Sequence, residues 1–200
     1  MITPEQERRI GEFWAWFQGR ERELATLDDP ESPLWEEALD LLQRVDEGLW
    51  FELPEPGGGD RQFIVTAGGD TGLFELAGAV ASRAPALDGW KIVPLNPPAG
   101  FDIEVDCEGF RLDASELWFK PAEEGSRPVD LIIGVPGYEE DEGTAVDNGV
   151  LDILDTGLGE RSAAEDVGEV EVVALPESPE KQGYRKLSEL PGFLEQGRKA

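Results

Sequence analysis

Apolar side chains recur with helical spacing through the first fifty residues, which predicts two consecutive helices. The first begins at Thr3-Pro4, where threonine can cap the helix and Gln6 completes a capping box. The second begins in the same way at Ser32-Pro33 and ends at Gly48. We expect this N-terminal helical hairpin to bury its aromatic side chains in a core rather than to present them as a docking surface. Its tryptophans are Trp14, Trp16 and Trp35.

From residue 49 the pattern changes to short apolar runs separated by turn residues. Residues 49–53 and 62–66 read as two strands of a hairpin, joined across Gly57-Gly58-Gly59-Asp60. Residues 71–83 then have helical spacing, and Pro85 ends that helix. Residues 90–95 form another apolar run, and we expect a third strand there.

The second half continues with strands around one long helix. Residues 101–107 alternate strictly between apolar and acidic side chains, which predicts a half-buried strand that turns at Glu108-Gly109. Further strands are expected at 117–119, 129–133 and 170–175, a helix from 144 to 157, and a short tail helix near 186–198.

This order predicts an α+β protein in which a mainly antiparallel sheet follows a split βαβ, ferredoxin-like plan with helices on one face. We expect a single domain over residues 1–200. It would consist of the helical hairpin (1–48), an α+β core (49–176) and a C-terminal tail with a short helix (177–200).

The net charge of the chain says more about its binding partners than about its fold. The 200 residues carry 44 acidic and 17 basic side chains, a formal net charge of −27. Such a charge repels nucleic acid and anionic membranes and attracts basic partners, so we expect no nucleic-acid or membrane binding. Basic residues gather only near the C-terminus, at Lys181, Arg185, Lys186, Arg198 and Lys199. The acid excess is also what adaptation to a salt-rich host would produce.

The chain has no histidine, which removes the common catalytic triads, zinc sites and imidazole acid–base pairs. The single cysteine, Cys107, excludes an internal disulfide and falls on the apolar side of its predicted strand, so we interpret it as a core residue. The N-terminus has no apolar signal segment, and no run of 18 apolar residues occurs. We therefore expect a cytoplasmic protein.

Three features of the chain are candidate sites. Asp102, Glu104 and Asp106 share one face of the predicted strand and could hold Mg²⁺ or Ca²⁺, although the same pattern is typical of an ordinary half-buried strand or of a guarded sheet edge. The run Glu139-Glu140-Asp141-Glu142 could contact a basic partner, or it could be a solvated loop before a helix. In the glycine-rich loop 67–72, we interpret Asp70 or Thr71 as a helix cap in a tight turn rather than as part of a phosphate site.

Four segments carry a resemblance to a known family: Phe63–Gly69, Ala84–Trp90, Asn96–Pro98 and Gly157–Glu160. Together they resemble an uncharacterised family of bacterial proteins that is described only as a domain of unknown function. The resemblance covers about residues 50 to 175 and rests on the general residue pattern and on the spacing of these segments, not on a diagnostic motif. It implies a small α+β domain in the bacterial cytoplasm, and it assigns no catalytic residue.

These observations favour a non-enzymatic regulatory or inhibitory module, similar in character to an immunity protein, that binds a basic protein through a negative face. The alternative is a divalent-cation-dependent enzyme that uses the strand carboxylates. No residue is assigned a catalytic role, no cofactor beyond that cation is expected, and the sequence leaves the oligomeric state and the identity of the partner open.

Overall fold

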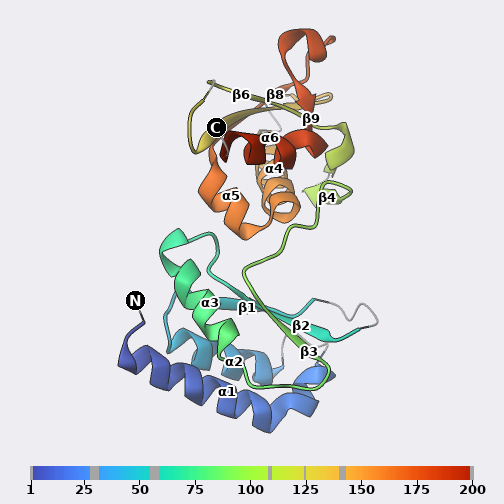
Figure 1. Ribbon diagram of the computed structural model, residues 1–200. Helices are drawn as coiled ribbons and strands as arrows, with labels where there is room; N and C mark the ends of the chain where they lie inside the picture. The colour runs from blue at the N-terminus through green and yellow to red at the C-terminus, as the bar shows by residue number, and fades with distance from the viewer. Residues whose placement is uncertain are drawn as a thin grey trace. The chain divides into compact units, whose positions relative to one another are not determined.

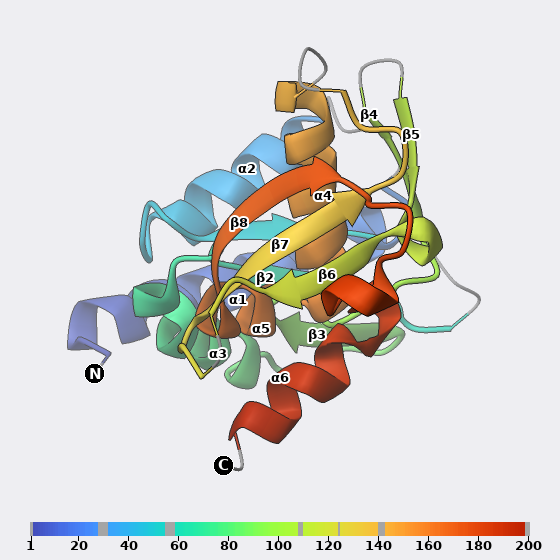
Figure 2. The ribbon, with the colours of Figure 1, turned by 90° about the horizontal axis from the view of Figure 1, so that it is seen from above.

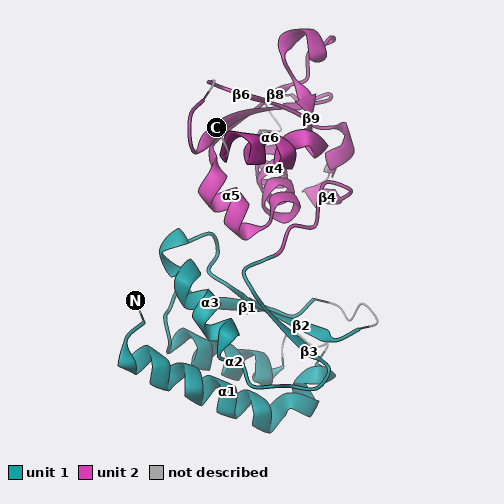
Figure 3. Cartoon of the chain, viewed as in Figure 1, with its two compact units in different colours: residues 1–96 teal, residues 97–200 magenta. Residues whose placement is uncertain are grey.

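The computed structural model describes residues 2–27, 32–54, 59–107, 110–123, 125–139 and 143–198. The chain divides into two compact units, residues 1–96 (unit 1) and 97–200 (unit 2) (Figure 3). This differs from the expected single domain with boundaries at residues 48 and 176. The physical reason is that the strands on either side of residue 96 hydrogen-bond into separate sheets, so each unit contains a sheet of its own.

Unit 1 begins with the predicted helical hairpin, α1 (Pro4–Ala25) and α2 (Pro33–Gln43) (Figure 1). The capping box is formed: the Thr3 side chain accepts from the backbone N–H of Gln6, and the Gln6 side chain accepts from the backbone N–H of Thr3. Ser32 caps α2 through the N–H of Leu34. α2 ends at Gln43, five residues before the glycine at which we expected it to end.

The sheet of unit 1 has the order β1-β2-β3, with β1 (Trp50–Glu52), β2 (Arg61–Thr66) and β3 (Trp90–Pro94). β1 and β2 are antiparallel, as a hairpin requires, whereas β2 and β3 are parallel. A parallel pair needs a crossover, and here the 3₁₀ turn Thr71–Leu73 and α3 (Phe74–Ser82) supply it. Asp70 caps this turn, accepting from the N–H of Gly72, as the sequence predicts.

Aromatic rings fill the interior of unit 1. Phe63 of β2 lies at the centre, with its ring centroid 5.0–6.0 Å from those of four other aromatic side chains. These are Phe13, Trp14, Phe17 and Phe51. Trp14 is 3 % exposed and donates its indole N–H to the carbonyl of Val80 at 2.9 Å, so the apolar stripe of α1 is a core face, as expected.

Arg61 is a buried cation in this apolar setting, with 7 % of its surface exposed. Its guanidinium donates to the carbonyl oxygens of Ala25 and Leu27 at the end of α1, and it lies over the ring of Trp90. These carbonyls have no partner within the helix, so one side chain of the sheet satisfies the end of α1.

Unit 2 starts with a two-stranded hairpin, β4 (Glu104–Cys107) and β5 (Phe110–Asp113), which forms a sheet of its own. A second sheet has the order β8-β7-β6-β9, and Figure 2 shows β8, β7 and β6 side by side. Its strands are β6 (Trp118–Pro121), β7 (Val129–Val135), β8 (Val167–Ala174) and β9 (Arg185–Lys186).

The helices of unit 2 are α4 (Gly143–Leu158), α5 (Glu160–Asp166) and α6 (Leu190–Arg198). Short 3₁₀ turns occupy Ala114–Glu116, Glu180–Gln182 and Leu187–Glu189. α4 and α6 share one core with the hairpin and with β6 and β7. This core is mainly aliphatic; its fully buried members include Leu131, Ile133, Val150, Ile153 and Leu190. Cys107 belongs to it, as expected.

The α+β class is confirmed, but the described strands form three separate sheets rather than the single sheet of a ferredoxin-like plan. Each unit instead contains a ββαβ arrangement. A hairpin strand lies antiparallel to a central strand, and a helical crossover leads to a third strand parallel to it. β2 is the central strand of unit 1, and β7 has the same place in unit 2.

Candidate partner-binding surface and pocket

The acidic run after β7 leads directly into α4. Glu139 is exposed, and Glu140, Asp141 and Glu142 lie outside the described residues. α4 itself is amphipathic. Its buried side contributes Val146, Val150, Ile153 and Leu154 to the core.

The opposite side of α4 is exposed and acidic. It presents Thr144, Asn148, Leu151, Asp152 and Asp155, which recur at the spacing of one helix face. Leu151 is 49 % exposed, and among the described residues only it and Trp50 are noted as large apolar side chains with such exposure. Asp152 forms no salt bridge with any described residue. We call Glu139 together with the exposed residues Leu151, Asp152 and Asp155 the α4 acidic face.

The sequence around this face lacks compensating charge. Residues 128–160 contain nine acidic side chains and no lysine or arginine. The negative charge of α4 is therefore not offset by any basic residue along this stretch, neither in the preceding loop nor on the helix itself.

The acids of α1 are in a different situation. Glu5 pairs with Arg8 and Arg9, Glu12 also pairs with Arg8, and Glu7 pairs with Arg83 of unit 1. Hydrogen bonds from Arg8 and Arg9 lower the pKa of Glu5 to about 2. Pairs spaced three or four residues apart neutralise a helix surface locally, so α1 is a charged surface with little net field of its own.

The strand carboxylates are arranged differently from the expectation. β4 begins at Glu104, so Asp102 lies in the segment before the strand. Glu104 forms a salt bridge with Arg111, and the same arginine is the register partner of Asp106 across the hairpin. A cation at these carboxylates would have to compete with that guanidinium. Across the described parts of the chain, no three His, Cys, Asp or Glu side chains gather closely enough to hold a metal ion.

A buried carboxylate, Asp166 at the end of α5, connects three elements of unit 2. Its side chain is 7 % exposed and accepts from the hydroxyl of Ser162 at 2.7 Å and from Nε of Arg198 at 2.9 Å. Arg127 approaches the same carboxylate at 3.5 Å and donates to the carbonyl of Leu194 in α6 at 2.7 Å. Burial alone would raise the pKa of Asp166, but the hydrogen bonds from Arg198 and Ser162 outweigh it and hold the pKa below its ordinary value.

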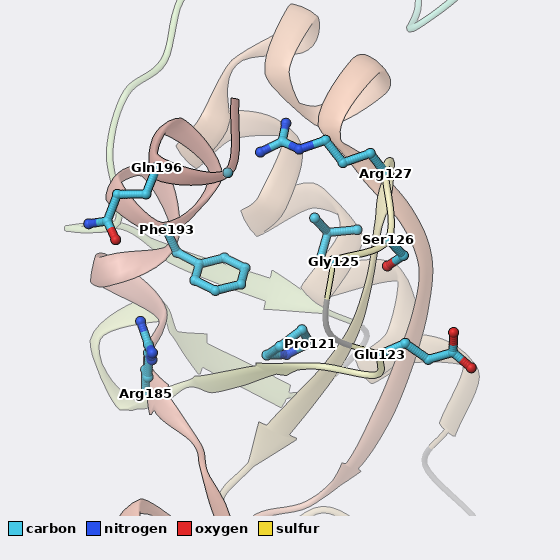
Figure 4. A pocket seen from close by; sticks show the side chains of 10 residues that line it. Pro121, Glu123, Gly125, Ser126, Arg127, Arg185, Phe193 and Gln196 are labelled. Atoms are coloured by element: carbon cyan, nitrogen blue, oxygen red, sulfur yellow. The ribbon is translucent and has the colours of Figure 1, made fainter. Parts of the chain in front are cut away.

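A pocket of about 410 Å³, with Arg127 in its wall, opens between the end of β6, the turn before β7, β9 and α6. Figure 4 shows the ring of Phe193 lying, in that view, between the side chains of Arg127 and Arg185. The Arg185 guanidinium lies 5.3 Å from the centre of the Phe193 ring. The wall also includes Pro121 and Ser126, and the Ser126 hydroxyl oxygen is buried without a hydrogen-bond partner among the described residues.

The sequence did not predict this pocket, although it showed the basic residues near the C-terminus, one of which lines the pocket. Arg185 belongs to the basic group that we noted near the C-terminus. Arg127 stands alone in an acidic stretch, and Phe193 belongs to a helix whose start we placed four residues too early. Nothing in their spacing indicates that the fold brings the three together.

Comparison of the chain with protein-family models, with curated proteins and with solved structures gives no match. The resemblance to a bacterial domain of unknown function is therefore neither supported nor opposed by them. No helix in the part of the chain that the structure describes combines the length and apolarity needed to cross a membrane.

Proposed function

We propose that this chain is a non-catalytic binding module that regulates or inhibits a basic protein, and that it docks this partner through the α4 acidic face. The single observation that carries the proposal is the local excess of acidic residues, because the stretch of sequence that contains this face has no basic residue. On α1, Glu5 and Glu12 pair with arginines of the same helix, whereas residues 128–160 contain nine acidic side chains and no lysine or arginine. An acidic face whose own stretch of sequence supplies no basic residue attracts a partner of the opposite sign.

The geometry suits a two-part contact. Carboxylates steer a basic partner over distances of about a Debye length, roughly 8 Å at physiological salt. Once the partner is near, Leu151 offers an apolar contact surrounded by those carboxylates. A rigid helix also holds this face in place, because its opposite side is anchored in the core of unit 2 through Val150, Ile153 and Leu154.

The proposal is tested by capture from native lysate at low salt, with partners identified by mass spectrometry. One variant combines Glu139→Gln, Asp152→Asn and Asp155→Asn. A matched control removes the same number of charges from unit 1 through Glu12→Gln, Glu23→Gln and Glu36→Gln, all at exposed positions. We expect a basic protein that the wild type and the control retain and that the α4 variant loses.

Two results would contradict the proposal. Equal loss in both variants would mean that basic proteins are held by net charge alone. Retention of the same partner by the α4 variant would place the contact elsewhere. Leu151→Ala separates the apolar contribution: it should speed dissociation with little effect on association, since uncharged contacts act after the encounter.

A further inference from the structure

We propose that the pocket beside α6 binds a small aromatic carboxylate, whose carboxylate group pairs with Arg185 and whose ring packs against Phe193. This site is separate from the α4 acidic face, and the inference does not depend on the proposed protein partner. It rests on the shape of the pocket and on its charge.

The shape fits a ligand of one ring with a short substituent. A volume of about 410 Å³ lies within the range of small-molecule sites, which is roughly 300–1,000 Å³. Apolar side chains form part of the wall: Pro121 at the end of β6, Val129 at the start of β7 and Phe193 of α6. A ring can stack or pack edge-on against Phe193, in the geometry that aromatic pairs prefer.

The charge of the pocket is opposite to that of the chain. Two of its wall residues, Arg127 and Arg185, are cationic, and the carboxylate of Glu123 points away from Phe193 in Figure 4. Arg185 forms no salt bridge with any described residue, so its guanidinium is available for a bidentate carboxylate contact. Arg127 is held in place by the carbonyl of Leu194 and adds positive potential without having to move.

The polar groups of the pocket limit the ligand further. The side-chain amide of Gln196 belongs to the wall and can donate a hydrogen bond to an oxygen of the ligand. Unit 2 carries 25 acidic and nine basic residues, so its overall field disfavours polyanions such as nucleotides. A monoanion gains the contact with Arg185 at the smallest electrostatic cost.

Isothermal titration of the full chain with benzoate and phenylacetate tests this assignment. Benzamide serves as the neutral analogue of the same shape, and inorganic phosphate as an anion without a ring. We expect saturable binding of at least one of the two carboxylates and at least about tenfold weaker binding of benzamide and phosphate. Arg185→Gln should weaken carboxylate binding by a similar factor, whereas Lys181→Gln, an equal change of charge at an exposed position outside the pocket, should leave it unchanged.

Phe193→Leu provides a second, uncharged variant, which should weaken benzoate more than acetate, while far-UV circular dichroism verifies that each variant is folded. Absence of saturable binding of both carboxylates at millimolar concentration would overturn the inference. Equal affinity for benzamide would remove the role of Arg185, and equal affinity for phosphate would remove the role of the ring. Unchanged binding in folded Arg185→Gln would place the carboxylates elsewhere on the molecule.

Discussion

Units 1 and 2 arrange three strands and a crossover in the same order, yet they fill their interiors with different side chains. Unit 1 packs aromatic rings around Phe63, and it contains five of the six tryptophans of the chain. Unit 2 packs leucine, isoleucine and valine between α4, α6 and its sheet. Connectivity is therefore compatible with quite different core chemistry, provided that each sheet face is covered.

The two units also differ in the groups that pair with an arginine near a helix. In unit 1 the two terminal nitrogens of the buried Arg61 donate to backbone carbonyls at the end of α1, while its Nε has no hydrogen-bond partner among the described residues. In unit 2 Arg127 donates to a carbonyl of α6 and also approaches Asp166. The first arrangement contains no titrating partner, and the second does, so acid should affect the two units unequally.

We expect the greatest loss of stability when a buried ring is removed from the core of either unit. Phe63→Ala should destabilise unit 1 by about 4 kcal/mol, and Phe119→Ala should destabilise unit 2 by a similar amount, because each removes a fully buried ring. Urea unfolding followed by tryptophan fluorescence reports mainly on unit 1, while circular dichroism reports on both. Phe63→Ala should shift the fluorescence midpoint and Phe119→Ala should leave it nearly in place. Equal shifts would show that the units unfold as one.

The next effect concerns Arg61. Arg61→Met should cost about 2 kcal/mol, because the carbonyl oxygens of Ala25 and Leu27 lose a charged donor in a buried site. Arg61→Lys is the informative control, since lysine keeps the charge but lacks the planar fork that reaches two acceptors. We expect it to recover less than half of the loss in denaturant midpoint. Full recovery by lysine would show that charge alone is needed there.

Asp166 should show a comparable effect that depends on pH. Asp166→Asn should cost about 2 kcal/mol at neutral pH, since it leaves Arg198 and Arg127 without their carboxylate. The pKa of Asp166 is below its ordinary value of 3.8 in the folded chain. Its stabilising contribution is therefore complete above that value and is lost as the pH falls through the folded-state pKa.

Urea midpoints of wild type and Asp166→Asn measured from neutral to strongly acidic pH should therefore converge at the acidic end. The corresponding difference between wild type and Arg61→Met should stay constant over the same range. A gap for Asp166→Asn that is independent of pH would contradict the assigned role of its carboxylate.

The smallest effect tests the N-terminal cap. Thr3→Ala should destabilise unit 1 by about 1 kcal/mol, because it removes the acceptor for the backbone N–H of Gln6. Thr3→Ser preserves this acceptor and should be close to wild type. Hydrogen exchange of the first turn of α1 provides the measurement, and equal exchange in all three proteins would mean that the capping box contributes nothing.

Local signals in the sequence were sufficient for most elements. The capping box at Thr3 and the hairpin of β1 and β2 depend on neighbouring residues, and the structure contains both; of the strand predicted over 101–107, it contains Glu104–Cys107. The errors arose where distant residues decide. We expected one mainly antiparallel sheet, but β2 pairs with β3 in parallel. Tertiary packing decides which strands pair, and the local sequence does not show it. α5 was missed because its seven residues show little periodicity, and its buried Asp166 is satisfied by Arg198, 32 residues away.

The same limit applies to the candidate sites. The acidic run before α4 is visible in the sequence, but the exposure of Leu151 among its carboxylates is a property of the packed helix. The carboxylates of β4 looked like a cation site because Arg111 comes opposite Asp106 only when the hairpin forms. The pocket is lined by residues of β6, β9 and α6, which are far apart in the sequence, so no single stretch of sequence predicts it.

The proposed function requires that the concentrated acidic charge of the α4 acidic face, rather than the net charge of the chain, selects a basic partner. Titration of the ¹⁵N-labelled chain with an octalysine peptide at low salt, followed by amide chemical shifts, tests it without knowledge of that partner. We expect the largest shifts within residues 144–155 and small shifts on α1, and we expect this pattern to be absent in the Glu139→Gln, Asp152→Asn, Asp155→Asn variant. Shifts spread evenly over α1 and α4, or largest on α1, would contradict it.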